Sequence, residues 1–275
     1  VKPRSQFLPW MDTQLADVVK QEVERNGVEL HCGHSINKIV PTAAIPQKSL
    51  AVVGDNFELV ADMVLVAIGV TPNSSFAAQS GLELGIDNSI TVDHSLLTSN
   101  KDIYAAGDCA DSFHIVTGGK AYIPLALRAN RAGWAVADNI CGKTIELPGV
   151  AGTAVFKVFD LEVARTGLNM AEAADNGFEP VDIYIKTRSR AHAHPGSSTI
   201  HVNMVADSKT GRLLGTQMVG KEGVAHRINA IAVALSSQMT VTQFSETDLA
   251  YAPPFGPVWD PLLTTANQLL KKMEQ

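Results

Sequence analysis

Several features that define common functional classes are missing from this chain of 275 residues. Its three cysteines, Cys32, Cys109 and Cys141, form no C-x-x-C pair, so buried reduced thiols are expected rather than disulfides or a zinc site. A formal charge of −6 without any basic cluster argues against binding to nucleic acid or to an anionic membrane surface. No run reaches the roughly 18 to 20 apolar residues of a membrane span. The first residues also lack the apolar core of a signal peptide, so we expect a cytoplasmic protein.

The chain also lacks a glycine-rich phosphate loop. No G-x-G-x-x-G motif follows any predicted strand. A dinucleotide-binding domain needs such a loop, because it brings the pyrophosphate to a helix start. The 45% hydrophobic content nevertheless indicates a globular protein long enough for two substantial cores.

The apolar periodicity predicts α/β structure in the first half. Asp12 is a plausible N-cap for a helix over residues 12–26, and Gly27 follows its end. The segment Met63–Ile68 is apolar throughout, as expected of a parallel strand covered on both faces. A small antiparallel meander is predicted, with strands over residues 36–40, 50–54 and 57–60. Further along, a short strand is predicted over residues 90–92 and a long helix over residues 123–140.

The second half changes character and predicts an α+β domain. Its strands are expected over residues 153–159, 181–186, 199–206 and 213–219, and its helices over residues 170–176, 224–237 and 260–273.

The segment Thr98–Asp108, TSNKDIYAAGD, predicts a short buried strand that ends in small residues and a carboxylate. Gly107 has no Cβ to obstruct a ligand, and Asp108 can accept hydrogen bonds from hydroxyl groups. Ligands of open α/β sheets bind at this end of the strands. Taken alone, the segment also fits an ordinary core strand followed by a Gly-Asp turn.

Three segments resemble FAD-dependent pyridine nucleotide-disulfide oxidoreductases. TSNKDIYAAGD resembles their second flavin fingerprint, which implies that Gly107 and Asp108 contact FAD. ADMVLVAIGVTPN resembles the end of their NAD(P)-binding domain and implies that Gly69 lies on the nicotinamide side. IPLALRANRAG resembles the segment whose helix begins under the flavin ring, where the N–H groups of Leu125 and Ala126 would favour the charge of reduced flavin.

The C-terminal segment DLAYAPPFGPVWDPLLTTANQL resembles the coenzyme A-disulfide reductase and NADH oxidase branch of this family. The resemblance implies that Tyr251 reaches the redox centre of the partner subunit and acts there as a catalytic hydrogen-bond or proton donor. KEGVAHRINAIAVAL resembles the same branch and suggests Arg227 as a helix-surface or interface charge. One departure is that Ala193 and His194 stand before Pro-Gly where disulfide-reducing members often have two tyrosines, which weakens the match to a coenzyme A-disulfide substrate.

Two further groups are assigned no chemistry. His192, His194 and His201 are interpreted as a solvated or interfacial edge, because no matching carboxylate or cysteine completes a ligand set, and no metal is expected. Cys109 is interpreted as a packed side chain, since nothing indicates the electropositive setting of a reactive thiol and the family's redox cysteine lies far upstream.

The resemblance implies the C-terminal portion of a longer enzyme. Residues 1–71 would end the NAD(P)-binding domain, 72–147 would end the FAD-binding domain, and 148–275 would form an α+β dimerisation domain of a homodimer. FAD and NAD(P)H would serve the parent enzyme, whose small-molecule substrate would be a disulfide, persulfide, peroxide or dioxygen. The chain itself is expected to be colourless and inactive, because it lacks the phosphate loop.

Two alternatives remain open, a cofactor-free dimerisation module and a standalone α/β binding protein without flavin. An Asp108 side chain in bulk solvent, away from any groove, is expected to argue against flavoenzyme ancestry.

Overall fold

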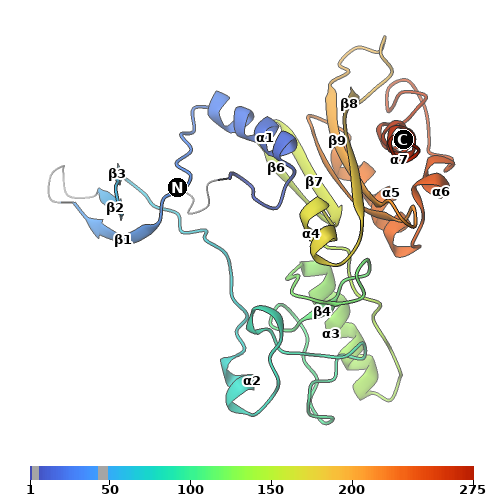
Figure 1. Ribbon diagram of the computed structural model, residues 1–275. Helices are drawn as coiled ribbons and strands as arrows, with labels where there is room; N and C mark the ends of the chain where they lie inside the picture. The colour runs from blue at the N-terminus through green and yellow to red at the C-terminus, as the bar shows by residue number, and fades with distance from the viewer. Residues whose placement is uncertain (2–5, 43–48) are drawn as a thin grey trace. The chain divides into compact units, whose positions relative to one another are not determined.

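A computed structural model describes residue 1, residues 6–42 and residues 49–275 of the protein (Figure 1). The chain divides into two compact units. The first comprises Val1–Gly69 with Lys157–Leu161, and the second comprises Val70–Phe156 with Glu162–Gln275. The elements are mixed α and β, as the sequence predicts.

The first unit begins with the amphipathic helix α1 (Thr13–Arg25), which confirms the prediction for residues 12–26. The Asp12 carboxylate caps it by accepting hydrogen bonds from the N–H groups of Gln14 at 3.0 Å and Leu15 at 3.4 Å. Apolar residues four apart, Leu15, Val19 and Val23, form its buried face.

A three-stranded antiparallel sheet follows in the order β1-β2-β3. Its strands are β1 (Ile36–Pro41), β2 (Leu50–Gly54) and β3 (Glu58–Ala61), which confirms the predicted meander. Ala51 and Val52 are its buried residues.

The prediction of a buried parallel strand at Met63–Ile68 is wrong. This segment forms no strand, and Met63, Leu65 and Ile68 are 84%, 87% and 84% exposed. A strand covered on both faces needs hydrogen-bonded neighbours and covering helices. Within the described residues no strand pairs with this segment, so its hydrophobicity alone does not bury it.

The second unit opens with short elements and one long helix. They are α2 (Ser75–Gln79), the 3₁₀ turn η1 (Ile86–Asn88), β4 (Ser112–Phe113), β5 (Lys120–Ala121) and α3 (Ala126–Ile140). Alanines on α3 pack with residues of the preceding loops in a small core, which includes Ile90, Val92, Leu96, Ala105, Ala132 and Ala135.

The strands predicted over residues 90–92 and 98–108 are reduced to isolated bridges. Ile90 bridges to Leu84 and Ala110, and Leu97 bridges to Tyr104. Ala105 is buried, whereas Ile103 is exposed, so the fingerprint segment contributes to the core without forming a continuous ladder.

The largest sheet lies in the second half of the chain, with its strands in the order β6-β7-β10-β9-β8. The strands are β6 (Ala154–Val158), β7 (Leu161–Gly167), β8 (Pro180–Arg188), β9 (Thr199–Asp207) and β10 (Leu213–Gly220). The helices are α4 (Met170–Asp175), α5 (Val224–Ser236), α6 (Val241–Ser245) and α7 (Pro261–Met273). The α+β prediction is confirmed, although β7 and α6 were not predicted.

Helices α5 and α7 pack against this sheet, with α5 on β10 and α7 on β8 and β9 (Figure 1). Their apolar faces include Ile228, Ile231, Leu235, Leu262 and Leu269, all of which are almost fully buried. Each such side chain contributes about 1.5–3 kcal/mol by leaving water. This continuous core explains why the local periodicity predicted these elements well.

Two further predictions concerned buried cysteines and the lack of a membrane-spanning segment. All three thiols are free, but Cys141 is exposed and Cys32 and Cys109 are only partly buried, so the expectation of buried cysteines is wrong. In the described part of the chain, every helix is too short or too polar to cross a membrane.

Candidate functional site

The Gly107–Asp108 turn presents a backbone without side-chain cover and an outward carboxylate. Gly107 has φ +93°, a conformation that favours glycine, and no atom lies within 4 Å of the position a Cβ would occupy. The Asp108 side chain is exposed. Burial raises the pKa of the Tyr122 phenol, and the Asp108 charge raises it further.

The start of α3 is a second potential ligand-binding element. Leu125 is its N-cap and no side chain caps the first turn. The amide N–H groups of Ala126 and Leu127 therefore have no acceptor within the helix, and the side chains of both residues are exposed. Unpaired amides at a helix start carry partial positive charge and favour an anionic group.

Arg128 joins these two elements. Its side chain is 5% exposed, and its guanidinium donates hydrogen bonds to the carbonyl oxygens of Gly107 and Asp111. Burial lowers the pKa of Arg128, while the Asp111 carboxylate partly opposes this effect. The structure thus brings together Gly107, Asp108, Leu125 and Ala126 through a residue that the sequence analysis missed.

Asp111 and Lys120 form an ion pair close to the Arg128 hydrogen bonds. The Asp111 Oδ1 atom accepts from the Val92 N–H at 3.1 Å and from Lys120 Nζ at 2.9 Å. Its Oδ2 atom has no hydrogen-bond partner among the described residues. Lys120 also lies 4.2 Å from the centre of the Phe113 ring, and that ring stacks on His94 at 3.8 Å. The Asp111 carboxylate is buried and the Lys120 side chain is 30% exposed, and this ion pair, with the hydrogen bond from Lys120 to the Val92 carbonyl, fixes β5 against the segment that precedes the fingerprint.

A cavity of about 800 Å³ in the second unit adjoins the α3 start. Leu125, Ala126 and Arg128 line it together with Phe113, and residues of α5 such as Ile228 complete its wall. Most of its lining is apolar, and the His94 ring that stacks on Phe113 also lines it.

The other two predicted site residues are not joined to this cluster. Tyr251 is 49% exposed, lies between α6 and α7, and makes no hydrogen bond through its hydroxyl in the described part of the chain. Gly69 belongs to the first unit and has φ +113°, again a conformation that favours glycine.

The three histidines do not form a cluster of metal ligands. His201 Nδ1 lies 2.7 Å from the Tyr184 hydroxyl, and burial lowers the pKa of His201. His194 Nδ1 lies 3.0 Å from the Pro195 carbonyl, and His192 is exposed. No group of three or more histidine, cysteine or acidic residues suited to a metal occurs among the described residues.

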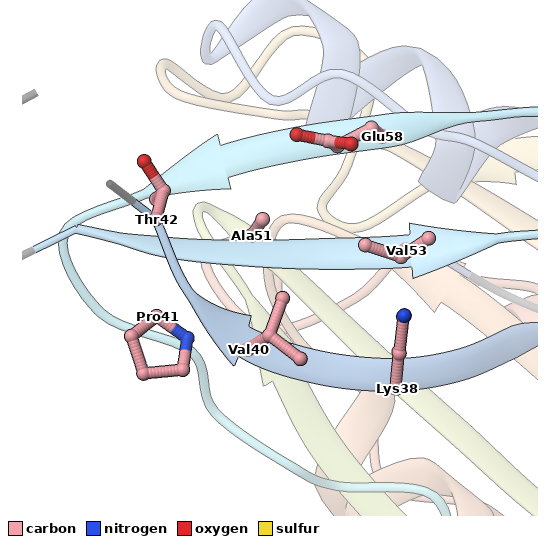
Figure 2. A pocket seen from close by; sticks show the side chains of 7 residues that line it. All are labelled: Lys38, Val40, Pro41, Thr42, Ala51, Val53 and Glu58. Atoms are coloured by element: carbon pink, nitrogen blue, oxygen red, sulfur yellow. The ribbon is translucent and has the colours of Figure 1, made fainter. Parts of the chain in front are cut away.

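An open hollow of about 550 Å³ lies on the sheet of the first unit, as Figure 2 shows. Lys38, Val53 and Glu58 are in register across its three strands, so an apolar residue separates two opposite charges. None of the predicted site residues lines this hollow.

Family models match most of the chain. The model described as pyridine nucleotide-disulphide oxidoreductase matches residues 1–133, and the model for the dimerisation domain of the same family matches residues 153–261. The chain is 37% identical over 258 residues to the NAD(P)H sulfur oxidoreductase (CoA-dependent) of Pyrococcus furiosus, covering 94% of the chain and 57% of that protein. It is 32% identical over 274 residues to the NADH oxidase of Methanocaldococcus jannaschii, covering 99% of the chain and 60% of that protein.

A solved structure, the NAD-dependent persulfide reductase from A. fulgidus, matches with a TM-score of 0.93 and 34% identity. The match covers 99% of this chain and 50% of that one. The chain thus spans a little over half the length of the first curated relatives it matches.

These matches hold although Asp108 faces solvent. A carboxylate that binds a separate ligand has to present its oxygens outward instead of using them inside the protein. The expectation that a solvent-exposed Asp108 argues against flavoenzyme ancestry is therefore wrong. The chain belongs to the pyridine nucleotide-disulphide oxidoreductase family, and its second half contains the dimerisation domain of that family.

Proposed function

We propose that this chain is part of an FAD-dependent NAD(P)H oxidoreductase that reduces a disulfide, persulfide, peroxide or dioxygen. The observation that carries the proposal is the bond between the Arg128 guanidinium and the Gly107 carbonyl. It holds the Gly107–Asp108 turn beside the α3 start, so the carboxylate and the helix-start amides belong to one rigid element.

The residues present fit part of FAD. Asp108 would accept hydrogen bonds from hydroxyls of the ribityl chain, and Gly107 leaves room for close approach. The Ala126 N–H would face the ring edge that becomes negative on reduction, whereas the Leu125 N–H already donates to the Ile123 carbonyl at 2.9 Å. When bound, the flavin supplies hydride and electron transfer. The sequence holds no G-x-G-x-x-G motif for the pyrophosphate, so we expect FAD to be lost on purification.

The catalytic role falls to Tyr251. Its phenol is half-exposed and has no acceptor within the described residues, so its proton is available to a group outside its own loop. In a homodimer formed through residues 148–275, Tyr251 would donate this proton to a sulfur or oxygen atom at the partner's redox centre.

Gly69 would line the nicotinamide side. Residues 1–71, 72–147 and 148–275 would be the NAD(P), FAD and dimerisation parts.

Among these substrates, we propose a sulfur compound as the electron acceptor. The P. furiosus and A. fulgidus relatives are named for sulfur and persulfide reduction. His194 and Ala193 stand before Pro-Gly in place of a tyrosine pair, which favours a persulfide or polysulfide over coenzyme A disulfide.

The test is flavin titration of the purified 275-residue chain. We expect a colourless homodimer that quenches the fluorescence of added FAD, and we expect Asp108→Asn to weaken this binding. Glu83→Gln, which changes another exposed carboxylate, is the matched control. FAD binding that is equal in the wild type and Asp108→Asn would contradict the assigned site.

A colourless dimer that never responds to FAD would favour a second candidate, a cofactor-free dimerisation module. The observation that favours this candidate is the continuous core formed by the five-stranded sheet and its helices, which needs no ligand to be complete.

A further inference from the structure

Arg227 lies in the first turn of α5, in the second unit. The sequence suggests a helix-surface or interface charge, and the helix-surface alternative is wrong, because the side chain is 13% exposed and its donors are used inside the chain. A buried guanidinium has a large desolvation cost, so its partners indicate what it stabilises.

The guanidinium of Arg227 binds four separate places. Nε donates to Asp260 Oδ2 at 2.7 Å, and Nη1 donates to the Gly223 carbonyl at 2.9 Å. Nη2 donates to the Phe255 carbonyl at 2.8 Å and to the Ser189 carbonyl at 3.3 Å. One planar group therefore ties the start of α5 to the loop after β8 and to two points before α7.

Two glycines make room for this arrangement. A Cβ on Gly223 would lie 2.2 Å from Arg227 Nη1, and Gly223 has φ +75°. A Cβ on Gly256 would lie 3.2 Å from Arg227 Nη2. The backbone is thus adapted to the guanidinium on both sides.

The segment held by Arg227 is the one that carries Tyr251. Directly after Tyr251, the N–H groups of Phe255 and Gly256 both bond to the Ala252 carbonyl, at 2.9 and 3.0 Å, and form a tight turn. Arg227 binds the Phe255 carbonyl of this turn. At the other end of the segment, Asp260 caps α7 by accepting from the Leu262 N–H at 2.9 Å.

Apolar packing does little to hold this segment. Phe255, Val258 and Trp259 are 78%, 66% and 61% exposed. Among the residues that the structure describes, a single backbone hydrogen bond links the turn to the loop after β8, from the Ala191 N–H to the Pro253 carbonyl at 3.1 Å. With little burial available, the order of the loop depends on hydrogen bonds.

We propose that Arg227 is the positioning residue for Tyr251. This inference rests on the proposed function, in which the Tyr251 phenol is the proton donor. The planar guanidinium reaches the Asp260 carboxylate and the Phe255 carbonyl at once, and so fixes the turn that follows the phenol. A lysine ammonium can keep the charge pair with Asp260 but cannot serve all four acceptors in this geometry.

The experiment uses the full 275-residue chain labelled with fluorotyrosine. The sequence has four tyrosines, and Tyr251→Phe assigns the ¹⁹F signal of Tyr251. In Arg227→Lys we expect this signal alone to move and the amides of Phe255 and Gly256 to exchange about tenfold faster. The matched control is Arg165→Lys, which changes an arginine of similar burial paired with Glu172 at 2.7 Å.

Unchanged ¹⁹F and exchange data in a folded Arg227→Lys variant would overturn the proposal. If that variant does not fold, Asp260→Asn replaces it, because the amide oxygen retains the cap of α7 while the charge pair is lost. We expect the same local loosening there, and its absence also overturns the proposal.

Activity is measured separately in the Tyr251→Phe variant. Full activity of Tyr251→Phe would remove the proposed catalytic role, whereas a loosened turn in Arg227→Lys would still establish what orders the loop.

Discussion

Replacing Arg128 by methionine tests whether the buried guanidinium joins the fingerprint turn to α3. The substitution keeps an unbranched side chain but removes the donors to the Gly107 and Asp111 carbonyl oxygens. Each hydrogen bond from a charged donor contributes about 1.5–3 kcal/mol. Methionine avoids the cost of burying a charge, the same cost that lowers the pKa of Arg128. We therefore expect a net loss of about 2–4 kcal/mol in the free energy of unfolding.

The assay is hydrogen exchange of the α3 amides as a function of urea concentration, because the Trp134 side chain on this helix is 73% exposed and its emission would change little on unfolding. The control is Arg131→Met, an exposed arginine on the same helix, which should change stability by less than about 0.5 kcal/mol. A loss below about 1 kcal/mol in Arg128→Met would refute the assigned role.

Other predictions concern binding, backbone fit, pH and solubility. Asp108→Asn should weaken FAD binding while leaving the melting temperature unchanged, since its side chain is exposed, as calorimetry can check. Gly167→Ala should cost several kcal/mol in urea denaturation because its Cβ would lie 2.2 Å from a backbone oxygen, whereas Gly177→Ala, also at positive φ but with open space, should cost about 1 kcal/mol. Burial lowers the pKa of His114 below 6.5, so the unfolded chain takes up the proton first and stability should fall as the pH drops below about 6.5. His114→Gln should reduce this fall in unfolding curves recorded above and below that pH. Leu65→Ser should lower dye binding and light scattering, because Leu65 is 87% exposed, and equal scattering would contradict this expectation.

Elements with local signals were predicted well. The helix predicted over residues 260–273 from its apolar periodicity is observed as α7, whose apolar face is buried and which Asp260 caps. β7 was missed because Glu162 and Arg165 interrupt its apolar pattern. Glu162 caps α5 instead, accepting from the N–H groups of Val224 and Ala225 at 2.7 and 2.9 Å. This capping role of Glu162 depends on a helix that lies far along the chain, so the residues around Glu162 give no sequence signal for it.

The residues of the candidate site also differ in whether the sequence could predict them. Gly107 and Asp108 were identifiable because their residue types carry the chemistry at adjacent positions. Arg128 was not, although an arginine within an alanine-rich helix was the available signal, because its role depends on carbonyl groups about twenty positions earlier in the sequence. Met63–Ile68 shows the opposite error, since hydrophobicity indicates what can be buried without supplying the neighbours that bury it.

The position of β10 in the middle of the large sheet constrains the order in which this domain can be assembled during synthesis. Strand β7 pairs with β10 and not with β8, its successor in the sequence, whereas β8, β9 and β10 form a consecutive antiparallel run. A ribosome therefore releases β7 and its neighbour β6 long before β10, the second neighbour of β7, exists, and closure of the β7–β10 pair carries the larger loop entropy. The nascent chain must keep the apolar residues of β7 from other partners until Leu213–Gly220 has emerged.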